Sequence, residues 1–309
     1  MKKSFLLNVI LLGIFISVNA QIKDTTYWNK NFSAGVNVNQ AAFNAEWKIA
    51  QGAVANAAVS AFLFTKSEYV KYKHSILNDL QLQYGRSYTE ANLIPTWRKN
   101  LDRIFFDNKY AYAISPNLGL FGSVLFNSQF DKGYSFAKSK GASNIGVRDT
   151  VELRSNFLAP GYLDEAAGLE WKPVPYFSSR FGPVAFRQTF VIDETVQRTT
   201  VIFNGKDSVS YGVKIGSKIR NQIGCNVVMK FDKDLAKNLN LKLIYQYFSA
   251  YENLAVSTNR IDGILTAKVA KFVNVNLQGV LFYNQDQNLN VQLSQALALG
   301  VVYQFTNKK

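Results

Sequence analysis

The stretch SQALALGVVYQFT, residues 294–306, alternates bulky apolar residues with small or polar ones almost to the end of the chain. Five residues share one parity: Leu297, Leu299, Val301, Tyr303 and Phe305. Because successive side chains of a strand point to opposite faces, these five predict a β-strand with one apolar face. An apolar face of this length needs an apolar environment, and the rest of the chain indicates which one.

The same period of two recurs through the chain in segments separated by turn residues. In the clearest of them, Ile219, Ile223 and Val227 alternate with Arg220 and Gln222. With 294–306, the predicted strands are 28–43, 53–65, 72–84, 101–114, 118–131, 162–172, 183–193, 213–231, 239–251, 258–271 and 273–284. The sequence therefore predicts twelve strands.

The connections between these segments alternate in length. Those after every second strand are short: around Ser67 and Glu68, 115–117, 173–175, 232–238 and 271–272. The others are mostly longer, notably 132–161 and 194–212. An even strand number, short turns on one rim and long loops on the other are typical of bacterial outer-membrane barrels. We predict an all-β fold, a single antiparallel transmembrane β-barrel with short periplasmic turns and long extracellular loops.

Composition agrees with a barrel of this kind. Aromatic residues make up 14% of the chain, yet the mean hydropathy is only −0.07. Lipid-facing apolar residues and lumen-facing polar residues would cancel in that mean. In lipid every backbone amide must be paired within the protein, so a spanning sheet has to close on itself.

The first twenty residues predict export. Lys2 and Lys3 precede an apolar run from Phe5 to Val18, and Ala20 ends a small-residue cleavage site. We expect a signal peptide at 1–20 and one outer-membrane barrel domain at 21–309. Without this segment the formal charge falls from +14 to +12, because two lysines and no acids are lost. The single cysteine, Cys225, excludes an intramolecular disulfide.

A basic chain can bind anionic partners such as nucleic acid, lipid headgroups or lipopolysaccharide. Export argues against nucleic acid, and the Lys and Arg residues are scattered singly rather than gathered in a basic block. The expected partners are outer-membrane lipid and lipopolysaccharide, the barrel-assembly machinery, and an ion or small molecule that the sequence does not identify.

The closing strand resembles the assembly signal by which outer-membrane barrels are recognised by their insertion machinery. Further landmarks are Asn39-Gln40, Phe43, Asn44, Trp47, Trp97-Arg98-Lys99-Asn100, Asp102, Arg103, Gln129-Phe130, Gly133-Tyr134, the run 157–162 and Val302-Tyr303-Gln304-Phe305. Together they resemble an uncharacterised family of Bacteroidetes outer-membrane barrels, a domain of unknown function. The resemblance implies a membrane barrel and carries over no catalytic or ligand residue.

Residues that could support catalysis are few. His74 is the only histidine, and the predicted topology puts it beside the short-turn rim, away from the outer leaflet where a barrel lipase would need it. Asp164 with Glu165, and Asp193 with Glu194, are adjacent carboxylates without a histidine partner in view. We expect no catalytic residue, no metal site and no cofactor, with an outer-membrane hydrolase as the minor alternative.

Charged residues of inward parity are the more informative set. The lumen-lining candidates are Arg103, Asp107, Lys109, Arg187, Lys214, Lys218, Arg220, Lys230, Lys242, Asp262 and Lys268. They are mostly basic, which favours anions if the lumen is open. The alternative is an interior filled by paired charges and amides with no continuous pore. The sequence thus supports a small channel or uptake pore with a preference for anions, or a structural barrel that binds lipopolysaccharide or a surface partner through its loops.

Overall fold

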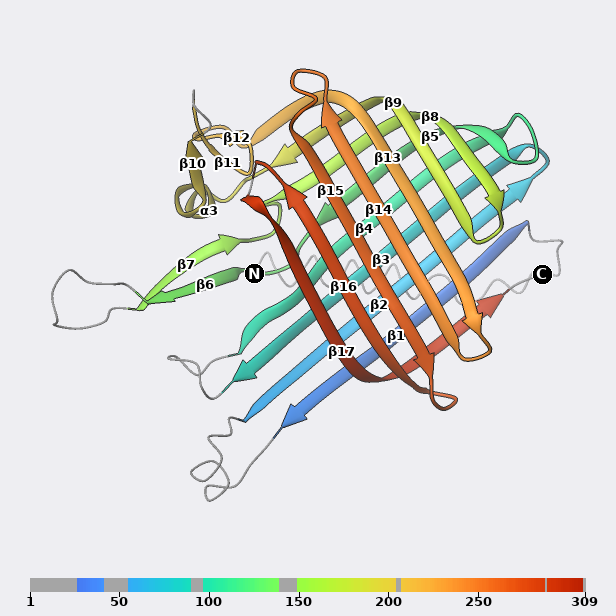
Figure 1. Ribbon diagram of the computed structural model, residues 1–309, viewed down its shortest axis with the longest axis horizontal. Coiled ribbons are helices and arrows are strands. Elements are labelled where there is room, and N and C mark those ends of the chain that lie inside the picture. Colours follow the sequence, from blue (N-terminus) through green and yellow to red (C-terminus); the bar gives the residue numbers. More distant parts are fainter. Residues whose placement is uncertain are drawn as a thin grey trace, which may run out of the picture.

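In the computed structural model, twelve long strands form a closed antiparallel barrel in which each barrel strand pairs with the next one along the chain (Figure 1). The structure describes residues 27–41, 55–89, 97–138, 149–203, 207–286 and 288–307, so the predicted signal peptide at 1–20 lies outside it. The barrel strands are β1 (Trp28–Ala41), β2 (Asn56–Lys71), β3 (His74–Thr89), β4 (Arg98–Ala113), β5 (Leu118–Ser128), β8 (Gly161–Val174), β9 (Phe177–Phe190), β13 (Ile219–Ala236), β14 (Leu239–Ala250), β15 (Ser257–Lys268), β16 (Val273–Asn284) and β17 (Asn288–Asn307). The predicted twelve-stranded antiparallel barrel is confirmed.

The last strand closes the barrel on the first. β17 pairs with β1 from Lys30 opposite Asn307 to Val38 opposite Leu299. Close packing at this seam depends on Gly300, because a Cβ there would lie 2.0 Å from the Asn37 side-chain oxygen. The buried Asn37 amide in turn donates a hydrogen bond to Ser60 of β2 at 3.2 Å.

Several predicted boundaries are wrong by up to six residues, and the closing strand begins at Asn288 rather than at residue 294. β2 runs through Ser67 and Glu68, and the chain turns at Tyr72, which has a φ of 52°. Polar residues do not end β2 there because both of its edges remain paired, with β1 and with β3. The strands predicted at 183–193 and 213–231 are Phe177–Phe190 and Ile219–Ala236.

A β-bulge in β9 explains one of these errors. Its register against β8 and β13 shifts near Pro183, which has no backbone N–H to contribute to the sheet. The extra residue reverses the parity of the strand, so Arg180 and Arg187, seven positions apart, are both buried side chains of the inner face. A strict period of two would place them on opposite faces.

The outer surface of the barrel is apolar. Large hydrophobic side chains are exposed on successive strands, among them Leu120, Leu169, Phe181, Ile223, Leu243, Leu281 and Leu293. Aromatic pairs gather at the short-turn ends of the strands: Trp28 with Tyr69, His74 with Tyr112, Trp171 with Phe177, and Tyr176 with Phe231. An apolar band bordered by aromatic rings is the outer surface that a lipid bilayer requires.

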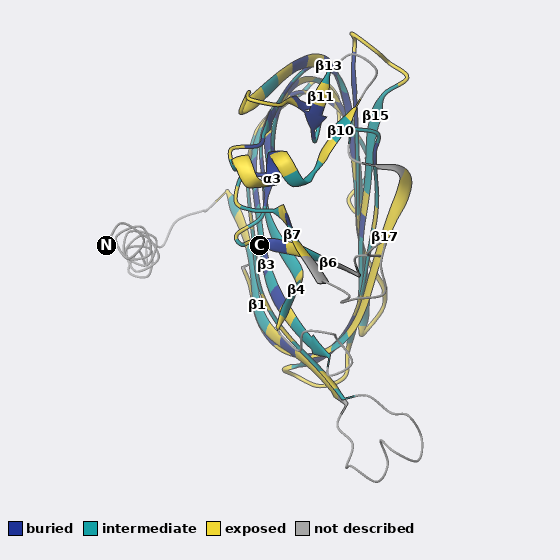
Figure 2. Ribbon diagram, turned by 90° about the vertical axis from the view of Figure 1, so that its left-hand side faces the viewer, coloured by how far each residue is buried: buried dark blue, intermediate teal, exposed yellow. Residues whose placement is uncertain are grey.

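Apolar side chains of the inner face meet across the barrel. Phe105, Leu125 and Val228 form a buried cluster, and Ile244 packs against it. These residues come from β4, β5, β13 and β14, and the barrel is correspondingly flattened, with β3 and β4 in one wall and β15 and β17 in the other (Figure 2).

The long connections carry structure of their own on one rim. They contain the hairpin β6 (Gly133–Lys138) and β7 (Asp149–Ser155), the helix α3 (Glu194–Thr199), and the small sheet β10 (Val201–Phe203), β11 (Ser208–Ser210) and β12 (Val213–Lys214). Leu153, Ala159, Val191, Val196 and Val213 form a separate hydrophobic core beneath them. In the described part of the chain no helix is both long and apolar enough to cross a membrane.

Candidate functional site

Six of the eleven predicted lumen charges form ion pairs on the inner face. They are Arg103, Asp107, Lys109, Arg187, Lys230 and Asp262. Their partners include Asp79, Asp164, Glu170, Arg180 and Arg260. Of these partners, the sequence singles out only Asp164, as one of two adjacent carboxylates rather than as an inward charge. Asp79, Glu170 and Arg260 lie within predicted strands and have inward parity there. The period-two alternation that places Asp107 and Asp262 on the inner face therefore also predicts these three residues to face inward.

Asp107 is the centre of the network. Its carboxylate accepts two hydrogen bonds from the Arg180 guanidinium, at 3.0 and 2.6 Å, and the Lys230 ammonium lies 2.9 Å away. Lys230 also donates to Asp79 at 2.7 Å. Asp107 has no exposed surface, and Arg180 is 3% exposed. Because β13 and β3 are separated in the ring by β9, β8, β5 and β4, the Lys230–Asp79 pair crosses the interior.

A second buried group lies toward the short turns. The Lys109 ammonium of β4 donates to the Glu170 carboxylate of β8, and Lys172 lies 3.4 Å from the same carboxylate. Toward the long loops, Arg187 binds Asp164 through two nitrogens at 2.5 and 2.8 Å and donates to Thr258 at 3.1 Å. Each buried charge in these groups therefore has an opposite charge in contact, as burial in a low dielectric demands.

Arg103 and Arg260 share one carboxylate. Arg260 donates to both oxygens of Asp262, at 2.8 and 2.9 Å, while Arg103 reaches the Oδ2 atom at 3.1 Å. Arg103 lies on β4 and Asp262 on β15, which are six places apart in the ring of twelve strands and therefore opposite each other. The flattening of the barrel brings these opposite strands close enough for a direct ion pair between their side chains.

The other five predicted lumen charges lie outside this buried network. Lys214 belongs to the small sheet above the barrel and Lys218 to the loop that follows, so the prediction that they line the lumen is wrong: the barrel strand begins only at Ile219. Arg220 is partly exposed and pairs with Asp286 at 2.9 Å. Lys242 is about half exposed beside Asp232, and Lys268 is exposed at the end of β15.

Two other predicted sets can be placed. The assembly-signal residues Leu297, Leu299, Val301, Tyr303 and Phe305 are all more than half exposed on β17. His74 begins β3 beside a short turn, where its Nδ1 lies 2.7 Å from the Tyr110 hydroxyl. Within the described residues no group of His, Cys, Asp and Glu is arranged to hold a metal ion.

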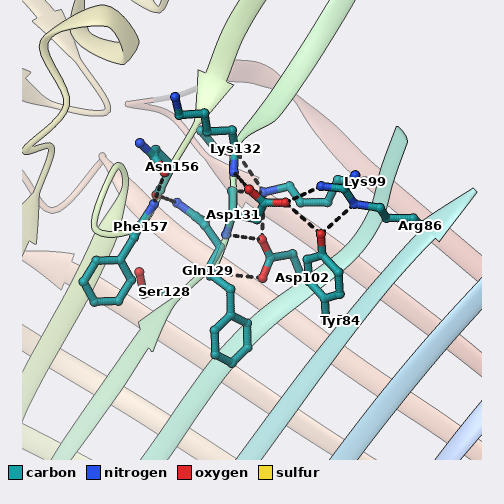
Figure 3. Close-up of polar contacts among 12 residues, drawn as sticks. Tyr84, Arg86, Lys99, Asp102, Ser128, Gln129, Asp131, Lys132, Asn156 and Phe157 are labelled. Atoms are coloured by element: carbon teal, nitrogen blue, oxygen red, sulfur yellow. Dashed lines mark hydrogen bonds and ion pairs between the residues drawn. The ribbon is translucent and has the colours of Figure 1, made fainter. Parts of the chain in front are cut away.

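A polar rim cluster of Tyr84, Arg86, Lys99, Asp102 and Asp131 anchors the connection that follows β5 (Figure 3). Asp102 accepts hydrogen bonds from the backbone N–H groups of Phe130 and Asp131, at 2.8 and 2.9 Å, and pairs with Lys99 at 3.0 Å. Asp131 accepts from Tyr84 at 2.7 Å, from Arg86 at 2.6 Å and from the Lys132 N–H at 2.7 Å.

These contacts predict a pH-dependent anchor. Burial alone would raise the pKa of Asp131, but hydrogen bonds from Tyr84 and Arg86 outweigh burial and lower the pKa to about 2. Since the pKa is lowered by folding, the stabilisation is complete above the ordinary value of 3.8 and is lost as the pH falls toward about 2. We expect the hydrogen-exchange protection factor of the Lys132 amide to fall across this interval, and Asp131→Asn to remove the pH dependence.

The control is the Leu158 amide, which donates to the uncharged Ser128 hydroxyl at 3.1 Å. Its protection should not change over the same interval. Equal loss at both amides would contradict a role for Asp131 and indicate general unfolding of the rim.

The fold and its outer surface define a class: a closed antiparallel β-barrel with an apolar exterior and a charged, ion-paired interior. Residues 38–134 match a family model described as Protein of unknown function (DUF3078), less than half of the chain. The resemblance to a family of unknown function is thereby confirmed for the landmarks from Asn39 to Tyr134; those at 157–162 and Val302–Phe305 lie outside the matched range. No curated protein matches the sequence.

Several solved barrels are similar in overall form. The translocator domain of the autotransporter NalP from Neisseria meningitidis aligns over 98% of each chain, with a TM-score of 0.37 and 10% identity. The NanC porin has a TM-score of 0.36 and 8% identity, over 87% of this chain and 98% of the porin. An outer membrane channel from Pseudomonas putida F1 has a TM-score of 0.36 and 9% identity, over 93% of this chain and 100% of the channel. Likeness of this degree carries no argument about function.

Proposed function

We propose that the protein is an integral β-barrel of the bacterial outer membrane that acts as a narrow channel for ions or small solutes. The observation that carries the proposal is the contrast between its two surfaces. The outer face is apolar along the strands, while the inner face carries Arg, Lys, Asp and Glu side chains on six of the twelve strands. Outer-membrane barrels use this alternation to place a polar interior within lipid.

The cross-barrel ion pairs argue for a small conductance. The Asp79–Lys230 and Asp107–Arg180 pairs join different parts of the wall through the middle of the barrel. Side chains held in this way occupy space that a wide aqueous pore would leave to water. The same observation favours the alternative, a structural barrel whose folded outer rim binds lipopolysaccharide or a surface partner without transport.

Anion preference is the finer part of the proposal. Six inward bases, namely Arg103, Lys109, Arg180, Arg187, Lys230 and Arg260, contact five inward acids, namely Asp79, Asp107, Asp164, Glu170 and Asp262. The surplus among these residues is one positive charge, at the Arg103 and Arg260 pair. We therefore expect a modest preference for anions rather than the strong one that the sequence alone suggests.

Single-channel recording in planar bilayers tests the channel. We expect small unitary currents from the full chain and larger ones from the double variant Asp79→Ser with Lys230→Ser, which removes one cross-barrel pair and leaves Asp107 bound to Arg180. The matched control is Asp232→Ser with Lys242→Ser, a pair that lies about half exposed near the short turns. Its currents should equal those of the wild type.

Each outcome decides between the alternatives. The absence of current from both the wild type and the Asp79/Lys230 variant would overturn the channel and leave the structural barrel. Current without a difference between the two double variants would show that the cross-barrel pair does not limit flow. A reversal potential in asymmetric KCl that indicates cation preference would overturn the anion preference alone.

A further inference from the structure

A small pocket lies at the long-loop end of the barrel interior, directly beside Arg103 and Arg260. It has a volume of about 240 Å³. β4, β5, β8, β15 and β16 contribute its walls, and residues of the loops, among them Gln129 and Tyr211, contribute its upper side. Since one water occupies about 30 Å³ of the liquid, the pocket has room for about eight waters or for one small organic molecule of similar bulk.

The charge of this pocket is not balanced by its own residues. The two guanidinium groups are held by the single carboxylate of Asp262. Asp102, the acid that lines the pocket itself, is already neutralised by Lys99 and bound to two backbone N–H groups. The lining therefore has a net charge of about one positive unit. In a partly buried site, a guest anion would compensate this charge better than the protein does by itself.

The arginines also have hydrogen-bonding capacity left over. A guanidinium has five N–H donors, and Arg103 uses one of them on Asp262. Among the described residues, its buried Nε has no hydrogen-bond partner. Planar guanidinium groups fit carboxylates in particular, because both oxygens can accept parallel hydrogen bonds. A monocarboxylate matches both the charge and the donors.

The remaining wall favours an organic ring next to the carboxylate. The Phe282 ring lies 5.7 Å from the Arg260 guanidinium, and Tyr162 and Pro160 add further carbon surface. Asn127, Ser128 and Gln129 provide polar groups at the other side. The pocket thus combines a mainly polar lining with an aromatic surface, and polar groups that converge beside an aromatic wall fix the orientation of a small ligand.

We propose that this Arg103–Arg260 pocket binds a small carboxylate that carries a planar, apolar ring. The carboxylate lies against the two guanidinium groups and the ring lies against Phe282 and Tyr162. Binding at this site does not require that the barrel conducts ions. An experiment can therefore contradict the proposed pocket without contradicting the proposed channel, and the reverse.

Isothermal titration calorimetry on the full chain in detergent tests the pocket with benzoate as the probe and benzamide as its uncharged counterpart. We expect benzoate to bind at least tenfold more tightly than benzamide, with an affinity that falls as the salt concentration rises. Arg260→Gln should reduce benzoate affinity at least tenfold and abolish the difference between the two compounds. This variant leaves Asp262 paired with Arg103, so no buried carboxylate is left without a partner.

Arg220→Gln is the matched control, since Arg220 is another inner-face arginine near the long loops, pairs with Asp286 and does not line the pocket. Its benzoate affinity should equal that of the wild type, and the heat-dependent gel shift of a folded barrel should be present in all three proteins. Equal binding of benzoate and benzamide, equal loss in both variants, or no heat of binding at millimolar benzoate would each overturn the proposal. Loss of the channel currents with benzoate binding intact would overturn only the proposed function.

Discussion

Asp107→Asn is expected to lower the free energy of unfolding by about 3–5 kcal/mol, the usual effect of removing one partner of a buried ion pair. Asp107 is completely buried and is bound by Arg180 and Lys230. Without its charge, Arg180 loses its only ion-pair partner among the described residues, while Lys230 retains Asp79. Urea unfolding of the purified barrel in lipid vesicles, followed by circular dichroism, measures the change.

Asp232→Asn is the matched control, because Asp232 and its partner Lys242 are both nearly half exposed. Exposed pairs contribute about 0–1 kcal/mol, so the control should lie close to the wild type. A second variant, Asp107→Leu with Arg180→Met, replaces both charges by apolar groups and should recover most of the lost stability. If Asp107→Asn and Asp232→Asn behaved alike, the interior would be hydrated rather than closed around the network.

Leu297→Arg is expected to destabilise the barrel in lipid by about 2–4 kcal/mol, the cost of an arginine facing the middle of a bilayer. Leu297 lies near the middle of β17 and is 63% exposed on its outer face. In a protein whose outer face met water, a charge at such an exposed position would have almost no effect. The free energy of unfolding measured in lipid vesicles therefore distinguishes an outer face in lipid from an outer face in water.

Phe305→Arg is the control for depth. Phe305 lies on the same face of β17 but near its short-turn end, opposite Phe32 of β1. Near the edge of the bilayer the cost falls to about 0–1 kcal/mol. A large penalty at Phe305 and a small one at Leu297 would place the bilayer elsewhere on the barrel.

The strands were predictable because their information is local. Alternation along 239–251 or 273–284 decides which face is apolar without reference to any other part of the chain. The resemblance to a family of unknown function was also visible in short motifs near Asn39 and Trp97, within the range that the family model matches.

The partners of the inward charges were not predictable, because they depend on which strands face one another. Parity places Arg103 and Asp262 on the inner face but does not bring β4 against β15. That contact follows from the flattening of the closed ring. At Arg180 even parity fails, because the bulge near Pro183 adds one residue to the strand. Lys214 and Lys218 were predicted to face the lumen although they lie outside the barrel. The sequence alternation of β13 continues upstream into a small sheet that is not part of the barrel.

The seam between β1 and β17 has a consequence for biogenesis. Lys30 and Asn307 are paired although 277 positions separate them. The hydrogen bonds between β1 and β17 therefore close a loop that contains almost the whole chain. Contacts between such distant segments are entropically costly and form slowly. Until they form, β1 and β17 both present unpaired edges that other chains can join. The strand that completes the barrel therefore also sets how long the unfinished protein must be kept apart from other copies of itself.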